Sequence, residues 1–254
     1  MLTAGMSEQE AERKQALLER AGAGLVQLRG TPPKAVFRWW VPGRIEFLGK
    51  HTDYAGGRSL LCAPERGICL AAAPRQDDRL RVHDAITGET LDEPMSEHAS
   101  LEATSRPGHW SNYLRAVARR LVRNFGSPLT GADVALASDL PQAAGMSSSS
   151  ALVVATFLSL ARINDLRSRD MYRRAIQTGE QLAEYLGTIE NGQSFHELAG
   201  ERGVGTFGGR RSHGDPLRQR PDVDAIRFLS RSAGAHRSLS GGSRASDRHE
   251  RCRC

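Results

Sequence analysis

The segment LPQAAGMSSSSALVVA, residues 140–155, sets a glycine, a methionine and four consecutive serines against a run of small apolar residues. Its strand-like start and helix-like end place the serines where a helix begins. A helix N-terminus has unpaired backbone N–H groups and a partial positive charge, so this segment is suited to binding phosphate oxygens. The residues expected to contact phosphate are Gly145, Met146, Ser147, Ser148, Ser149 and Ser150.

The serine run also has a simpler interpretation, in which one serine caps the helix and the others are ordinary loop residues. The run contains no Gly-Lys-Ser/Thr triplet, which excludes a P-loop. Serine hydroxyls can in addition ligate Mg²⁺, a hard cation that prefers oxygen.

A second segment, PGRIEFLGKHTDYAGG at residues 42–57, gathers five chemically versatile side chains between glycines. Guanidinium and ammonium groups can steady phosphoryl oxygens, and a carboxylate beside an imidazole can bind vicinal sugar hydroxyls. This combination is unusual for a plain turn. The side chains are Arg44, Lys50, His51, Asp53 and Tyr54.

Both segments resemble known family motifs. PGRIEFLGKHTDYAGG is similar to the galactokinase signature, and LPQAAGMSSSSA is similar to the phosphate-binding motif of the GHMP small-molecule kinases. WSNYLRAV at 110–117 resembles the galactokinase helix segment between them, so the resemblance covers about residues 35–209. It implies transfer of the γ-phosphoryl group of ATP to the anomeric hydroxyl of galactose or a related monosaccharide, with Mg²⁺.

The resemblance also implies roles for single residues. Arg44 would stabilise phosphoryl transfer, and His51 and Asp53 would hold sugar hydroxyls, with Tyr54 beside them. The serine loop would wrap the ATP phosphates.

One member of the loop, Ser149, stands where the family uses a serine for Mg²⁺. A glutamate on a later helix would be the second Mg²⁺ ligand, and Glu180 and Glu184 both remain candidates.

Two departures from the family pattern affect the expected chemistry. Lys50 replaces a glutamate just before the histidine, which predicts either a carboxylated substrate such as a uronic acid or a lysine turned toward solvent. Gln193 stands where the family carries an aspartate, and an amide cannot accept the proton of the sugar hydroxyl. Glu190 is the nearest alternative carboxylate for that role.

The domain organisation is predicted to be a galactokinase-like GHMP kinase N-terminal domain of α+β class over 1–209, followed by a different segment over 210–254. GHMP kinases have a C-terminal α+β domain, and nothing in 210–254 resembles it. We therefore expect a truncated kinase whose turnover is in question.

Residues 210–254 hold 11 arginines and 5 acidic residues, which leaves 24 basic and 24 acidic side chains in residues 1–209. This segment is interpreted as an arm that binds anions or RNA, a disordered tail, or an altered reading frame. The neutral balance of 1–209 argues against nucleic acid as a partner of the main domain.

Composition also bears on the cellular location of the protein and on the state of its cysteines. No apolar run approaches the ~20 residues that span a bilayer, and the N-terminus lacks an export signal, which predicts a soluble cytoplasmic protein without a membrane partner. The four cysteines do not form a zinc pattern, so Cys62 and Cys69 are expected to be buried thiols, and Cys252 and Cys254 an incidental pair.

Periodicity predicts helices over 8–29, 110–125, 148–161 and 168–186, the last capped by Ser168 or Asp170. Strand character appears in FRWWVPGRIEFLG, SLLCAPERGICLAAA, RLRVHDA and DVALASDLP.

Two other functions remain open at this point. A catalytically inactive sugar-binding regulator would bind sugar without consuming ATP. An RNA-binding protein that uses the arginine-rich segment would lose its binding steeply with added salt.

Overall fold

The computed structural model describes residues 6–48, 60–95, 108–141, 144–201 and 203–204, and the backbone of 234–237. In chain order the elements are α1 (Glu8–Arg29), β1 (Phe37–Pro42), β2 (Ile45–Leu48), β3 (Leu60–Cys62), β4 (Gly67–Pro74), β5 (Arg79–Asp84), β6 (Thr90–Pro94), α3 (Ser111–Phe125), β7 (Ala132–Ser138), α4 (Ser148–Ile163), η3 (Leu166–Ser168), α5 (Asp170–Ala175), α6 (Gly179–Asn191) and β8 (Gly234–Arg237).

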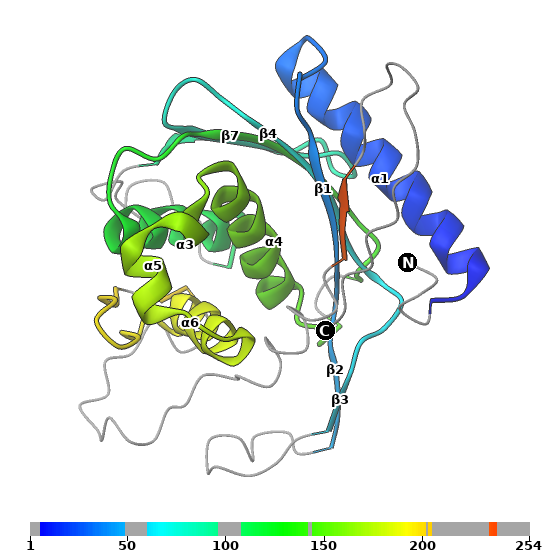
Figure 1. The fold of residues 1–254 in the computed structure, drawn as a ribbon. Helices are drawn as coiled ribbons and strands as arrows, with labels where there is room; N and C mark the ends of the chain where they lie inside the picture. Colours follow the sequence, from blue (N-terminus) through cyan, green and yellow to red (C-terminus); the bar gives the residue numbers. More distant parts are fainter. Residues whose placement is uncertain are drawn as a thin grey trace, which may run out of the picture.

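A six-stranded sheet in the order β6-β5-β7-β4-β1-β8 forms the centre of the fold (Figure 1). Its neighbouring strands run antiparallel except for the parallel pair β5 and β7. A separate ribbon of β2 and β3 extends beyond one end of this sheet. β1 therefore does not form a hairpin with β2, although only Gly43 and Arg44 separate them.

Helices cover both faces of the sheet. α1 lies against β4, β5 and β7 on one face, and α3, α4, α5 and α6 lie on the other (Figure 1). The strand β4, GICLAAAP, is buried along almost its whole length because it is central and covered on both faces. α4 is apolar over most of its surface because it lies between the sheet and the other helices.

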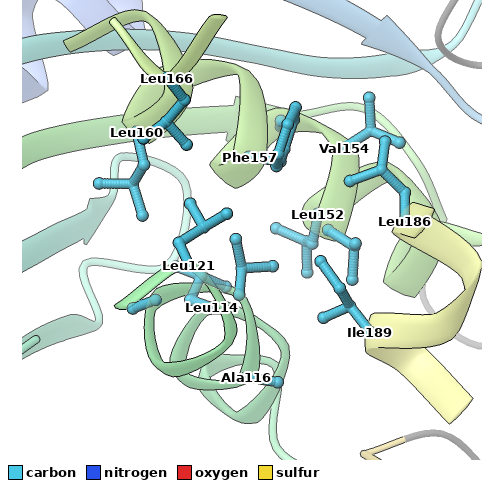
Figure 2. Packing of buried hydrophobic residues seen from close by; sticks show 14 of the residues in the cluster. Leu114, Ala116, Leu121, Leu152, Val154, Phe157, Leu160, Leu166, Leu186 and Ile189 are labelled. Carbon is cyan, nitrogen blue, oxygen red and sulfur yellow. The ribbon is translucent and has the colours of Figure 1, made fainter. Parts of the chain in front are cut away.

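The main core lies between the sheet and the helices α3, α4 and α6. Figure 2 shows Leu121, Phe157 and Leu186 among the side chains that meet there. One large polar side chain, Arg120, enters this core with hydrogen-bond partners for its Nε and Nη2, while its buried Nη1 has none among the described residues. The fully buried Arg120 donates to Asn124 Oδ1 at 2.8 Å and to Thr188 Oγ1 at 3.1 Å.

The structure confirms the predicted helices at 8–29 and 110–125 and the one starting at 148, together with the strand that enters the serine loop. The prediction of one helix over 168–186 was wrong, because α5 ends at Ala175 and α6 begins at Gly179. Thr178 forms a capping box with Gln181 and so starts a new helix, whereas neither Ser168 nor Asp170 is a cap.

One short strand, β8, comes from the arginine-rich segment and pairs antiparallel with β1. The rest of 210–254 lies outside the described residues. Among the helices that the structure describes, none is long and apolar enough to cross a membrane.

Candidate functional site

The turn after β1 and the serine loop before α4 are in direct contact, although about a hundred residues separate them. The backbone N–H of Arg44 donates to the carbonyl oxygen of Met146 at 3.0 Å. Its side-chain Nε donates to Ser147 Oγ at 2.9 Å. The two segments that the sequence analysis identified therefore meet in one site, through Arg44 of the first segment and Met146 and Ser147 of the second.

Gly43 allows this close approach. A Cβ atom at this position would lie 2.8 Å from the carbonyl oxygen of Met146 and 2.6 Å from Leu140 Cδ2, closer than Cβ atoms normally come to other atoms. The Gly43 N–H donates to the carbonyl oxygen of Arg66 at 2.9 Å, which ties the turn to the start of β4. The glycine before Arg44 is thus required by packing.

The serine loop has an unusual backbone. Gly145 has φ of 69°, and Ser147, the N-cap residue of α4, has φ of 53° and ψ of 44°. Non-glycine residues adopt this left-handed conformation at a cost and often do so at functional sites. The Ser147 side chain makes no capping hydrogen bond and instead accepts a hydrogen bond from Arg44 Nε. The simpler interpretation, in which a serine hydroxyl only caps the helix, therefore does not hold for Ser147.

The first turn of α4 has backbone N–H groups that make no hydrogen bond within the helix. The first bond of the α4 ladder runs from the Ala151 N–H to the carbonyl oxygen of Ser147 at 3.0 Å. The N–H groups of the residues just before Ala151 have no carbonyl four residues earlier within the helix. Such groups, at the positive end of the helix dipole, favour an anion.

A carboxylate lies next to the same turn. Ser150 is 8% exposed, and its Oγ donates to Glu190 Oε2 at 3.0 Å. Glu190 is near the end of α6, so this helix brings its charge to the serines. Glu184 lies on α6 as well, six residues earlier and so about 9 Å along the helix axis.

Tyr113 on α3 also belongs to this site, and the sequence interpretation missed it. Its phenol is hydrogen-bonded to Ser149. Burial and the negative charge of Glu190 raise the pKa of Tyr113, so the phenol stays protonated. The only sequence signal was its place in WSNYLRAV at 110–117, a segment that reads simply as an amphipathic helix.

Gln193 follows α6 in the described part of the chain. Its carbonyl oxygen accepts from Arg120 Nη2 at 2.5 Å, which fixes the backbone just beyond Glu190. Arg120 also binds Thr188, so this buried side chain holds the chain on both sides of Glu190.

Four predicted sugar-binding residues, Lys50, His51, Asp53 and Tyr54, lie outside the described residues. The strands that flank them pair with each other, with Leu48 opposite Leu60. Arg44 precedes this ribbon directly, so it joins the serine loop to the segment that contains the four residues.

The groups near the start of α4 that could ligate a metal ion are one carboxylate and several serine hydroxyls. Within the described parts of the chain, no three His, Cys, Asp or Glu side chains gather to form a metal site. One carboxylate next to serine hydroxyls suits Mg²⁺, which takes one or two protein carboxylates and completes its shell with phosphate oxygens and water. The helix N–H groups suit the phosphate rather than the metal ion. The residues present therefore fit Mg²⁺ bound together with a phosphate ligand.

Comparison with protein families gives two matches. Residues 112–191 match the GHMP kinases N terminal domain. Residues 27–74 match the galactokinase galactose-binding signature. The two matches cover the serine loop and the Arg44 turn respectively.

Among curated proteins, the galactokinase of Roseiflexus sp. is 41% identical over 140 residues, which are 54% of this chain and 34% of that protein. The galactokinase of Chloroflexus aurantiacus is 35% identical over 144 residues, which are 57% of this chain and 35% of that protein. The chain thus spans about a third of the length of these relatives.

Among solved structures, Lactococcus lactis galactokinase complexed with galactose matches with a TM-score of 0.56 and 22% identity. The match covers 68% of this chain and 42% of that one. It supports the α+β fold of the domain.

Proposed function

This chain is a galactokinase-like protein of the GHMP kinase family, and we propose that it binds ATP with Mg²⁺ and transfers the γ-phosphoryl group to the anomeric hydroxyl of galactose or a closely related sugar. The observation that carries this proposal is the contact between Arg44 and Ser147. It brings a guanidinium from the galactose-binding signature to the helix entry that is suited to phosphate.

The nucleotide phosphates bind at the loop of Gly145 and Met146 and at the first turn of α4. Gly145 lets a phosphate approach the backbone, and the N–H groups of Ser148 and Ser149 donate to it. Arg44 lies beside this position and neutralises charge on the phosphoryl group during transfer.

Glu190 and the hydroxyls of Ser149 and Ser150 are the groups that would hold Mg²⁺. Glu190 is preferred over Glu184 because its carboxylate already accepts a hydrogen bond from Ser150. When bound, Mg²⁺ supplies charge neutralisation for the phosphates. Glu190 is thereby proposed as a metal ligand rather than as a base.

The sugar is proposed to bind at His51, Asp53 and Tyr54, next to the ribbon that Arg44 precedes. Because Gln193 cannot accept a proton, activation of the sugar hydroxyl would depend on Arg44 and on positioning, which dominate phosphoryl transfer. Lys50 would favour a uronic acid over galactose if its ammonium faces the substrate.

Isothermal titration calorimetry of the full chain with ATP, with and without Mg²⁺, tests the nucleotide site. We expect ATP to bind more tightly with Mg²⁺, and we expect Glu190→Gln to abolish this difference while metal-free ATP binding stays within about twofold. Glu184→Gln is the matched control from the same helix and should keep the Mg²⁺ effect. A Glu184→Gln variant that loses the effect, beside a Glu190→Gln variant that keeps it, would contradict the assignment.

Turnover is then tested by measuring ADP release with galactose and with galacturonate. Phosphorylation of galactose supports the proposal, and a clear preference for galacturonate assigns Lys50 to the substrate. Sugar binding without ADP release would favour the inactive regulator. If the chain binds neither ATP nor sugar, the proposal is wrong.

A further inference from the structure

An ion pair between a buried lysine and a partly exposed aspartate connects α1 to the residue that leads into the serine loop. The Lys14 side chain is fully buried, and its Nζ is paired with Asp139 Oδ2. It also lies 3.3 Å from Glu10 Oε2, one turn earlier on α1. Asp139 follows the last residue of β7 directly, and the loop begins after it.

Asp139 is bound on its other side to the start of β4. Its Oδ1 accepts from the Gly67 N–H at 2.7 Å, and its own N–H donates to the Gly67 carbonyl oxygen at 3.3 Å. The preceding residue, Arg66, accepts from the Gly43 N–H, next to Arg44. One carboxylate thus connects α1, the end of β7 and the turn that carries Arg44.

The energetics make this connection rigid. A buried ammonium without a partner is strongly unfavourable, so Lys14 restricts the positions that Asp139 can occupy. Hydrophobic packing alone would fix the position of α1 relative to the end of β7 less sharply, because apolar contacts are non-directional. The helix that supplies Lys14 lies on the face of the sheet opposite α4 (Figure 1).

We propose that Lys14 and Asp139 are positioning residues that fix the serine loop, Gly145 to Ser150, against Arg44, so that ATP affinity depends on an ion pair behind the site. Neither side chain touches the nucleotide. The inference rests on the proposed function for its effect on ATP, whereas the effect on the loop itself is independent of that function.

The test compares the full chain with the double variant Lys14→Met/Asp139→Asn. Methionine keeps most of the buried volume, and asparagine keeps an acceptor for the Gly67 N–H, so the double variant leaves no unpaired buried charge. The matched control is Arg29→Gln. It removes a 2.5 Å ion pair between the same α1 and Asp133 of β7, at the end of the strand far from the loop.

Hydrogen exchange without nucleotide is the first readout. We expect exchange of the amides of 144–150 to be about 10-fold faster in the double variant than in Arg29→Gln. Calorimetry with Mg²⁺ and ATP is the second readout, and we expect about 10-fold weaker binding in the double variant. Thermal unfolding of both variants separates these effects from a general loss of stability.

Loop exchange and ATP affinity equal to those of Arg29→Gln would overturn the inference and leave the pair a purely structural role. If the unmodified chain binds no ATP, the proposed function fails, and the exchange rates alone then decide whether the pair positions the loop. If the double variant does not fold, the single variant Lys14→Met is measured in the same way, because it leaves no buried ammonium and Asp139 still accepts from the Gly67 N–H. Unchanged exchange in that variant would equally overturn the inference.

Discussion

Arg44 is the residue on which the proposed chemistry depends most. Its Nε donates to Ser147 Oγ at 2.9 Å, which holds the planar guanidinium beside the serine loop. Lysine keeps the charge but not this geometry. We expect Arg44→Lys to lower kcat for sugar phosphorylation about 100-fold with a smaller change in KM for ATP, because the lost interaction acts on the transition state.

Steady-state kinetics measure this effect, and thermal unfolding checks that the variant is folded. Arg79→Lys is the matched control, because it makes the same exchange at a partly exposed arginine of β5 that pairs with Asp92 away from the site. It should retain most of the kcat. Equal kcat in Arg44→Lys and the unmodified chain would contradict the role given to the guanidinium.

The two described cysteines differ sharply in environment, and the prediction that both are buried was wrong for Cys62, which lies on the short strand β3 of the outer ribbon. Burial raises the pKa of Cys69 to about 12, whereas Cys62 is exposed. Alkylation requires the thiolate, so at about pH 8 Cys69 has on the order of 1,000-fold less reactive form than an ordinary thiol. We expect iodoacetamide to label Cys62 in the native protein and Cys69 only after denaturation, as measured by peptide mass spectrometry.

The raised pKa of Cys69 also makes the stability of the folded protein depend on pH. The folded state holds Cys69 protonated, so its contribution to stability is complete below the ordinary thiol pKa and is lost as pH rises toward about 12. Rapid labelling of Cys69 in the native protein at about pH 8 would show that β4 is not buried as described.

At the level of the elements, α6 matters because it carries Glu190. Its start is fixed by Thr178, which accepts from the Gln181 N–H at 3.2 Å, while the Gln181 side chain accepts from the Thr178 N–H at 3.1 Å. We expect Thr178→Ala to lower the free energy of unfolding by about 1 kcal/mol, because one backbone donor of the helix loses its partner. Denaturant unfolding measures this change.

Thr178→Ser is the control and should be nearly neutral, since serine caps as well as threonine. A Thr178→Ala variant as stable as the unmodified chain would mean that α6 does not begin at this cap.

This cap also shows where sequence interpretation failed. The apolar spacing over 168–186 fits one helix, because α5 and α6 both bury residues against the same core. Thr178 followed by Gln181 is a capping signal that was visible in the sequence and was outweighed by that spacing. The serine loop was predictable for the opposite reason, because its glycine and hydroxyls interrupt the apolar pattern at one definite place.

The contacts between distant segments could not be predicted from spacing. Tyr113, Ser150 and Glu190 come from three helices, and only the packing of α3, α4 and α6 brings them together. The burial of Lys14 could not be predicted either, because a lysine on an amphipathic helix is usually exposed to solvent. Its burial depends on Asp139, which is 125 residues away in the sequence.

In the whole molecule, the sheet positions the site because β1 and β7 terminate, and β4 begins, at the same end of the sheet. Pro42 of β1 lies opposite Gly67 of β4, and Ile68 lies opposite Ser138 of β7, so the Arg44 turn and the serine loop leave the sheet side by side. α4 covers one face of the sheet, with α6 packed against α4, and α1 covers the other face. The central claim is therefore that two segments distant in sequence form a single nucleotide phosphate site.

Hydrogen exchange of the full chain with and without Mg²⁺ and a non-hydrolysable ATP analogue tests this claim most directly. The account predicts that the amides of 144–150 and of 43–46 gain protection together and over the same range of analogue concentration. Protection of only one of these segments, or protection confined to other parts of the chain, would contradict it.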